Sequence, residues 1–420
     1  MIKINHVRML CMLVFAVLLF LGCQNERIGG KLKELYVDCS QAKLFLSDGK
    51  YVESISYIPL ETTEGNYLNE VDGLRIFGEY FFFIERDGLN NKVISIFDKR
   101  GTFIRQISSP EEGPGYFMSV YDLWYDEEKD VIELLDSGSG KIVKYSLAGE
   151  HIGDLYLPGQ FQEFVKFSEN KYALYSGFSP QNSGMYNFCH LRGGALQSCS
   201  LEFPEFFIGH KMEGPHFAPP ALDHDNFLLH DSFNDTIYCF NRDENSLYPA
   251  YRLDLGNTWI DEKWISDFAN GDMREKMMLM NRSGYVNSFL YAHEENGILT
   301  VAFRNSTERR RYFYFFDRIK NRSYLFYAQS PQTLDFISNG FDQGPITSNF
   351  LARQGNDLYF LIESADFKYH FDRGEQKSSS NTVSDVQLSR YQQVQEEISN
   401  KLNNGDNPVI MQVSINFSKL

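Results

Sequence analysis

A hairpin that recurs along the chain is the feature that most constrains its fold. Residues 93–107 form two runs of alternating apolar and polar residues, separated by a polar turn with a glycine. The same pattern returns about 48 residues later, over 142–155. A sheet unit repeated at this period is typical of a β-propeller blade. The sequence therefore predicts a ring of small antiparallel sheets.

Strand patterns place six such units along the chain, and they predict an all-β, six-bladed β-propeller. The units begin near residues 68, 116, 161, 215, 286 and 347. Each consists of short alternating runs bounded by turn residues. We expect Tyr51–Leu60 and Val409–Phe417 to pair in one blade and close the ring, because closure removes exposed sheet edges.

Two small helical insertions interrupt the strand pattern. The segment 259–282 lengthens the fourth unit, and its apolar residues have the spacing of one helix face. We interpret it as a helix packed on the rim, with a partner-binding helix as the alternative. A second helix is predicted over about 384–403, followed by Gly405 and Pro408. The segment Phe367–Phe371 before it is predicted as a strand of the sixth unit.

The N-terminal residues resemble the signal of a bacterial lipoprotein. Lys3 and Arg8 precede an apolar run over 9–21, which is shorter than the ~20 residues needed to cross a bilayer. Leu21-Gly22-Cys23 then resembles a lipobox, where the signal is removed and the new terminal cysteine is lipidated. We expect a signal peptide over 1–22, a tether over 23–50 lipidated at Cys23, and a propeller over 51–420. An ordinary secretory signal is the alternative.

The charge of the chain argues against nucleic acid as a partner. Removing residues 1–22 takes away Lys3 and Arg8 and changes the formal net charge from −16 to −18. Such a surface repels phosphate backbones. We expect the body to be monomeric and to contact the membrane through its N-terminal lipid.

Two cysteines flank a turn. Cys189 and Cys199 lie almost symmetrically about Arg192-Gly193-Gly194, so on a hairpin they would face each other. In an oxidising compartment such a pair forms a disulfide, and two separate thiols are the equally open alternative.

Six residues are candidates for binding a ligand because they lie on or near the first strand of a unit. First strands line the channel of a propeller, and ligands bind at its mouth. The candidates are Asp72, Arg75, Asp122, Trp124, His216 and His293. Trp124 would stack on a sugar ring if it faced the channel, and core packing is the alternative.

No cofactor is predicted, and metal binding is kept as an alternative. Asp72 and Asp122 would suit calcium if they converged in the channel, although the sequence has no EF-hand loop. His216, Asp223-His224-Asp225 and His230-Asp231 have the residue types of a transition-metal site. Adjacent residues of a strand point to opposite faces, which favours polar turns over a shared ion.

Four motifs resemble a known family. They are Ile58-Pro-Leu-Glu-Thr-Thr63, Phe97-Asp98-Lys99-x-Gly101-x-Phe103-Ile104, Glu112-Gly113-Pro114-Gly115-Tyr116 and Asn407-Pro408-Val409-Ile410. Over nearly the whole mature length, the chain resembles the six-bladed β-propeller lipoproteins of Bacteroides-type bacteria, which share the architecture of NHL and TolB-like propellers. The resemblance implies an outer-membrane location in the cell envelope and, by association with polysaccharide uptake, a glycan-related role. It implies no catalytic residues, because the function of the family is largely unknown.

The first functional hypothesis is a membrane-anchored, non-enzymatic lipoprotein that binds a ligand or acts as a scaffold, with a glycan or a protein as its partner. One alternative is a metal-assisted hydrolase or lyase acting on a glycan or lactone in the central channel. Another is a protein-interaction ring. The sequence has no Gly-x-Ser-x-Gly elbow, Walker loop or His-Glu-x-x-His motif, so binding is favoured and enzymatic activity is left open.

Replacing Cys23 with alanine is expected to abolish lipidation, because the modified group is the thiol at the cleavage site. Labelling with an alkyne analogue of palmitate, followed by detergent-phase partitioning, measures this directly. Cys39→Ala is the matched control and should stay labelled and membrane-bound. A Cys23→Ala protein that keeps its label would contradict the lipobox prediction.

Overall fold

The computed structural model describes residues 32–420 apart from 48, 87–91, 182–183, 211–215, 218–225, 306, 308–309, 330–338, 340, 346, 348–349 and 373–383. In the part of the chain that it describes, no helix is long and apolar enough to cross a membrane.

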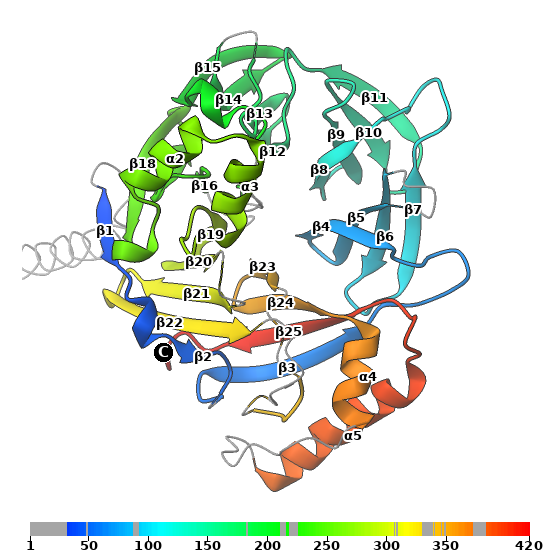
Figure 1. The fold of residues 1–420 in the computed structure, drawn as a ribbon. Coiled ribbons are helices and arrows are strands. Elements are labelled where there is room, and N and C mark those ends of the chain that lie inside the picture. Colours follow the sequence, from blue (N-terminus) through cyan, green and yellow to red (C-terminus); the bar gives the residue numbers. More distant parts are fainter. Residues whose placement is uncertain are drawn as a thin grey trace, which may run out of the picture.

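Six sheets surround a central axis, which confirms the predicted all-β six-bladed propeller (Figure 1). In the strand lists that follow, each blade is given from its innermost strand outward. Blade 1 holds β4 (Glu70–Phe77), β5 (Tyr80–Arg86), β6 (Lys92–Asp98) and β7 (Phe103–Ser108). Blade 2 holds β8 (Val120–Asp126), β9 (Val131–Asp136), β10 (Lys141–Ser146) and β11 (His151–Tyr156). Blade 3 holds β12 (Glu163–Ser168), β13 (Lys171–Tyr175), β14 (Tyr186–Arg192) and β15 (Ala195–Glu202).

The other three blades each include strands from the N-terminal part of the chain. Blade 4 holds β16 (Asn226–His230), β17 (Thr236–Asn241), β18 (Ser246–Asp254) and β1 (Lys33–Tyr36). Blade 5 holds β19 (Phe289–Glu295), β20 (Ile298–Arg304), β21 (Arg310–Asp317), β22 (Arg322–Gln329) and β2 (Lys43–Leu44). Blade 6 holds β23 (Phe350–Gln354), β24 (Asp357–Ile362), β25 (Val409–Ile415) and β3 (Val52–Pro59).

Strands from the two ends of the propeller close the ring in blade 6. β25 pairs antiparallel with β3, in a register that runs from Val409 opposite Pro59 to Ile415 opposite Val52. The prediction that these two segments pair is confirmed. The outer edge of the last blade is therefore a strand from the beginning of the propeller.

The segment before β3 also belongs to the ring. β1 pairs in parallel with β18, and β2 pairs in parallel with β22, with the 3₁₀ turn Cys39–Gln41 between them. Residues 33–59, which we call the N-terminal strap, thus cross blades 4, 5 and 6 in succession. Part of the range 23–50 predicted as a tether is therefore ordered sheet. Strands of four and two residues that pair in parallel with distant partners leave little local signal.

Aromatic and aliphatic side chains fill the spaces between blades. Phe82 and Ile94 of blade 1 pack with Leu123, Ile132 and Leu134 of blade 2, and all five are almost fully buried. Each such side chain contributes roughly 1.5–3 kcal/mol through burial. Because each blade buries both faces against neighbours, the high aromatic content serves packing around the whole ring.

The first helical insertion is two helices. α2 (Glu262–Asn270) begins at Asp261, whose side chain accepts a hydrogen bond from the Trp264 backbone amide. α3 (Met273–Arg282) begins at Asp272 with a capping box that includes Glu275. The predicted helical insertion over 259–282 is confirmed, but it is two helices rather than one, because Gly271 and Asp272 end one helix and begin the next. Trp264 and Phe268 anchor α2 against loops of blades 3 and 4 and against the 3₁₀ turn Glu205–Phe207, and a second 3₁₀ turn, Gly256–Thr258, precedes α2.

A second pair of helices lies outside blade 6. α5 (Asp385–Lys401), with a capping box of Ser384 and Gln387, confirms the predicted second helix. α4 (Ser364–Asp372) occupies the segment predicted as the strand 367–371, so that prediction is wrong. β25 and β3 already take the outer positions of blade 6, and the buried Phe367 packs instead against Tyr57 of β3.

Phe45→Ala is expected to destabilise the protein by about 3–5 kcal/mol, because Phe45 is fully buried between blades 5 and 6 and its removal leaves a cavity. Tyr36→Ala, in the same strap but 71% exposed, should change stability by no more than about 0.5 kcal/mol. Urea denaturation of both variants measures the difference. Equal midpoints would show that the strap does not bear on stability.

Candidate functional site

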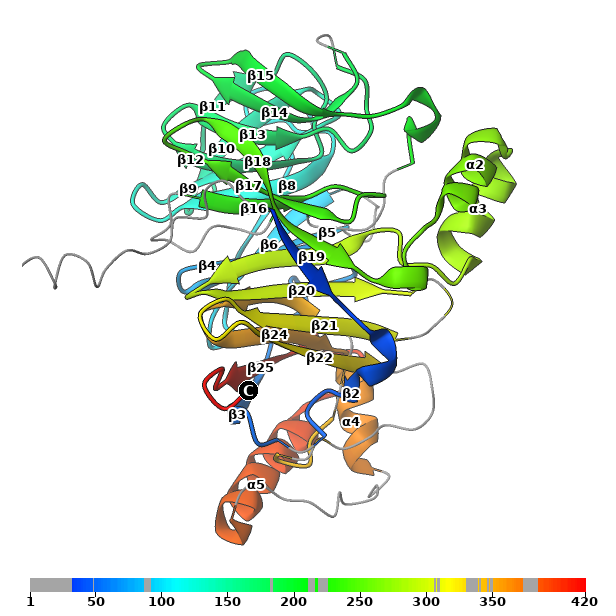
Figure 2. The same ribbon diagram turned by 90° about the vertical axis from the view of Figure 1, so that its left-hand side faces the viewer.

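A cleft of about 690 Å³ opens at one mouth of the channel. It is lined by the last residues of the innermost strands β4, β8, β12, β19 and β23, and by Arg242 in the turn after β17. β19 begins just after α3, and its far end lines the cleft, so the cleft opens on the face opposite α2 and α3 (Figure 2). Its volume lies in the range of small-molecule sites.

The charges that line this cleft balance. Five cationic side chains and five carboxylates face it: Arg75, Lys129, Lys166, Arg242 and Arg353, and Asp126, Glu127, Glu128, Glu169 and Glu295. The chain as a whole is strongly acidic. The cleft is therefore locally neutral on an acidic protein, and apolar side chains such as Trp124 and Phe167 line it beside these charges.

Arg75 and Asp122 form a buried ion pair at the edge of the cleft. Arg75 Nε donates to Asp122 Oδ1 at 2.9 Å, and the other oxygen accepts from the Phe164 backbone amide at 2.9 Å. Burial raises the pKa of the Asp122 carboxyl to about 6, although Arg75 opposes the rise. One carboxylate thus ties blades 1, 2 and 3 together beneath the cleft.

Lys166 forms a second buried network, between blades 2 and 3. Its Nζ donates to Asp126 at 2.9 Å and to Glu133 at 2.8 Å. Burial would lower the pKa of the Lys166 ammonium, but the two carboxylates outweigh it and raise that pKa. Lys166 is therefore held charged and in a fixed orientation at the cleft wall.

Blades 5 and 6 meet at Arg353. Its guanidinium donates at 2.8 Å to the carbonyls of Gly355 and Ile298 and to Thr300 Oγ1. Burial lowers the pKa of Arg353, and burial likewise lowers the pKa of the neighbouring His293. His293 Nε2 lies 3.5 Å from Glu295 Oε2. A histidine with this lowered pKa presents a neutral imidazole to the cleft at neutral pH.

Trp124 gives the cleft an aromatic wall. Its indole packs edge-on against Phe77, with ring centroids 5.1 Å apart, and it is only partly buried. It also borders the packed layers between blades 1, 2, 3 and 4. The indole therefore both packs in the core and lines the cleft, and stacking on a sugar ring stays a prediction.

The structure brings three of the six sequence candidates together. Arg75, Trp124 and His293 line the cleft, and Asp122 lies beneath it as the partner of Arg75. Asp72 lies nearer the other end of β4, where it pairs with Lys92 and Arg86. Asp72 and Asp122 each have their own cation and do not converge on a shared site.

His216 belongs to a buried network away from the cleft. Glu163 Oε1 lies 2.7 Å from His216 Nδ1, and His216 Nε2 lies 2.9 Å from Ser232 Oγ. The order of acid, imidazole and hydroxyl matches a hydrolase triad, but Ser232 is only 3% exposed. Glu163 also accepts from the His216 and Phe217 backbone amides, so the network joins blade 3 to blade 4. We interpret it as a structural brace.

The remaining metal candidates give no site in the described part of the chain. Residues Asp223, His224 and Asp225 lie outside the described residues. Asp231 accepts from Tyr175 Oη at 2.7 Å and from Asn187 Nδ2 at 2.9 Å. Among the described residues, no group of three His, Cys, Asp or Glu side chains is placed to hold a metal ion.

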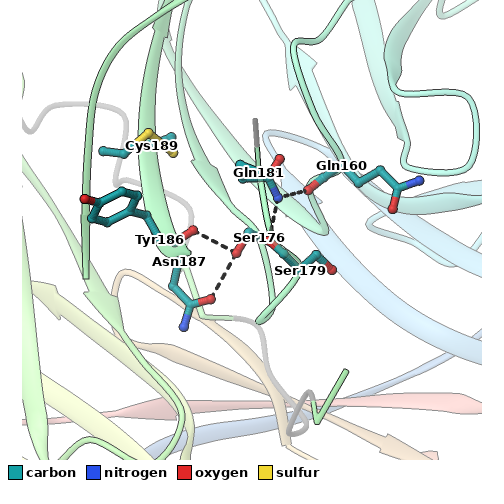
Figure 3. The surroundings of a disulfide bond; sticks show 8 residues. Gln160, Ser176, Ser179, Gln181, Tyr186, Asn187 and Cys189 are labelled. Atoms are coloured by element: carbon teal, nitrogen blue, oxygen red, sulfur yellow. Dashed lines mark hydrogen bonds between the residues drawn. A yellow bond between two sulfur atoms is a disulfide. The ribbon is translucent and has the colours of Figure 1, made fainter. Parts of the chain in front are cut away.

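Cys189 of β14 and Cys199 of β15 face each other across their hairpin and are joined by a disulfide. Figure 3 shows its surroundings, where Ser176 Oγ donates at 3.0 Å to the Tyr186 carbonyl. Gln181 Nε2 donates to the carbonyls of Gln160 and Ser179 at 2.6 and 2.8 Å. These bonds hold the loop after β13 against blade 3.

Sequence reasoning missed Lys166 and Arg353. Both lie near the end of an innermost strand, as Arg75 and Trp124 do. A charged residue near the end of a predicted first strand was the usable signal for Lys166, whereas no first strand was predicted over Phe350–Gln354, so Arg353 had no such signal.

Comparison with known proteins places the chain in a family. Residues 35–414 match the family described as a domain of unknown function, DUF4934. The chain belongs to this family. A solved Bacteroides fragilis protein inferred to be exported shares 15% identity at a TM-score of 0.68, and the match covers 92% of this chain and 99% of that one. A DUF4221 family member from Bacteroides vulgatus shares 9% identity at a TM-score of 0.52, covering 86% and 96%.

At such identities, the likeness of this DUF4934 member to the two Bacteroides structures shows the fold alone. No protein of curated function matches the sequence. The resemblance to Bacteroides-type propellers of unknown function is confirmed.

Stability is expected to fall as the pH rises through about 6, because of Asp122. Its pKa in the folded protein lies above the ordinary 3.8, so the folded state binds this proton more tightly than the unfolded chain. The resulting stabilisation is complete below about pH 4 and is lost as the pH rises through 6. The pKa difference corresponds to on the order of 3 kcal/mol.

Asp122→Asn should flatten this pH dependence between about pH 4 and 7 in urea titrations. Asp98→Asn is the control. Burial favours a higher pKa for the Asp98 carboxyl, but hydrogen bonds from Arg100 and Thr102 outweigh it and lower that pKa. Asp98 therefore titrates below this pH range. An unchanged slope in Asp122→Asn would exclude Asp122 as the cause.

Proposed function

We propose that this protein is an exported, membrane-anchored lipoprotein that binds a neutral oligosaccharide in the cleft without transforming it. The composition of the cleft supports this class of ligand, because the cleft combines balanced charges with the Trp124 indole. A net field would favour a charged ligand, whereas this surface offers many hydrogen-bonding groups and little net attraction for either sign.

Rigidity supports binding at this surface. Arg75, Lys166 and Arg353 each donate at least one hydrogen bond across a blade boundary and at least two in all. Side chains that are already ordered lose little entropy when a ligand arrives. A partly exposed indole beside them gives a sugar ring an apolar face on which to stack.

Export is supported by features outside the cleft. The chain begins with a basic stretch, a short apolar run and Leu21-Gly22-Cys23. The Bacteroides fragilis structure of the same fold is that of a protein inferred to be exported. A disulfide between Cys189 and Cys199 suits an oxidising compartment.

Tryptophan fluorescence tests the proposed site, because Trp124 lines the cleft while Trp259 and Trp264 lie by α2 on the opposite side. Titration with a panel of neutral oligosaccharides is expected to give a saturable change in wild type and Trp259→Phe, and none in Trp124→Phe. Calorimetry should show about tenfold weaker binding for Trp124→Ala, equal to about 1.4 kcal/mol.

The dependence of oligosaccharide binding on ionic strength is the second measurement. Binding of a neutral ligand should hardly change between about 0.1 and 1 M salt, where the Debye length falls from ~10 to ~3 Å. Binding restricted to acidic glycans or phosphate, with steep salt dependence, would contradict the proposal. So would a signal that is lost in Trp259→Phe and kept in Trp124→Phe.

A further inference from the structure

Helix α3 lies on the side of the ring opposite the cleft (Figure 2), and three of its methionine side chains are exposed to solvent. Met273, Met277 and Met278 are 64%, 54% and 51% exposed. Met273 and Met277 are four residues apart and share one side of the helix, and Met278 lies about 100° further round the helix from Met277. We call these three side chains the methionine face. Exposed methionines are adaptable contact surfaces for other proteins.

The propeller does not need this face for its own packing. α3 contains no fully buried residue. It meets the body through α2, the partly buried Leu279 and Met280, and Lys276, whose Nζ donates to the Phe206 carbonyl. A helix of this length is marginal by itself in water. The Asp272–Glu275 capping box nevertheless specifies it, so the sequence keeps an ordered helix whose three methionine side chains are more than half exposed.

Cationic side chains flank the methionine face. Arg274, Met278 and Arg282 follow one another at four-residue spacing, so they form a line along the helix. All three are exposed, and the arginines are separated by about 12 Å along the axis. The nearby Glu275 side chain is engaged in the capping box. An apolar, cationic surface on so acidic a chain suits an acidic, apolar partner.

Two other occupants fit this surface less well. A second copy would place arginines against arginines and bring two strongly acidic bodies together. A membrane anchored at Cys23 is tied to Lys33 by a segment that spans at most ~35 Å. β1 runs parallel to β18, whose end leads to α2, so the start of β1 points toward the cleft side of the ring.

We propose that the methionine face, with Arg274 and Arg282, docks an acidic amphipathic helix of another protein. The partner helix presents apolar residues to the three methionines and carboxylates about 12 Å apart to the two arginines. This surface is independent of the cleft, so the protein joins a bound ligand on one face to a protein partner on the other.

Site-specific photo-crosslinking in the full-length, membrane-anchored protein tests this surface. Met277→p-benzoylphenylalanine is expected to form one dominant adduct in the native envelope. Tyr156→p-benzoylphenylalanine on β11, which is 71% exposed, is the control for random collisions. Capture of a protein is not sufficient support, so the crosslinked peptide is sequenced by mass spectrometry.

The dependence of the adduct yield on Arg274 and Arg282 is the specific test of the proposed charge complementarity. Arg274→Glu/Arg282→Glu should lower the adduct yield on the order of tenfold, whereas Arg100→Glu in an exposed turn should not. Both variants should keep the wild-type unfolding midpoint, since the changed residues are exposed. An acidic amphipathic peptide with this charge dependence supports the proposal.

Four results would overturn the proposal: no adduct, an adduct with lipid, an adduct with a second copy, or a peptide without acidic residues. Binding of the purified protein to phosphatidylglycerol vesicles through the same arginines would also overturn it. The adduct should persist in Trp124→Ala, so a failure of the cleft hypothesis is distinguishable from a failure of this one.

Discussion

Ring closure is the constraint on which the rest of this structure depends. Each blade is a small twisted sheet that covers its faces only by packing against two neighbours. A ring left open would expose a layer of aromatic side chains and unpaired strand edges. The pairing of β3 with β25 removes both in blade 6. In the same way, β1 and β2 of the N-terminal strap pair with the outer strands β18 and β22 of blades 4 and 5. Residues distant in the sequence therefore hold the closing blade together.

Closure also fixes the geometry of the cleft, because polar side chains brace the boundaries between blades. Asp122 links blades 1, 2 and 3, Glu163 links blades 3 and 4, and Arg353 links blades 5 and 6. These groups are buried, so each would cost free energy without its partners. The hydrogen bonds of Asp122 and Arg353 also hold the ends of innermost strands in place around the cleft, whereas Glu163 braces the ring away from it.

The fold was predictable from the sequence because the repeated hairpins are local. The alternation of apolar and polar residues identifies their strands, and the repeat identifies the blades. Three features were not. β1 and β2 are short and pair with strands that are distant in the sequence. α4 is a helix where a strand was predicted, because β25 and β3 already fill the outer positions of blade 6. Gly271-Asp272 divides the first helical insertion into two helices. The site was predictable only in part, because first-strand position selects Arg75 and Trp124 but also Asp72, which faces Lys92 instead.

Hydrogen–deuterium exchange during titration with neutral oligosaccharides tests most directly the claim that the braced cleft is the binding site. The account predicts slower exchange at the ends of β4, β8, β12, β19 and β23 and no change in α3 or in the outer strands β7 and β11. Protection confined to the outer strands or to α3 under saturating ligand would contradict it, and binding would then have to be placed elsewhere on the ring.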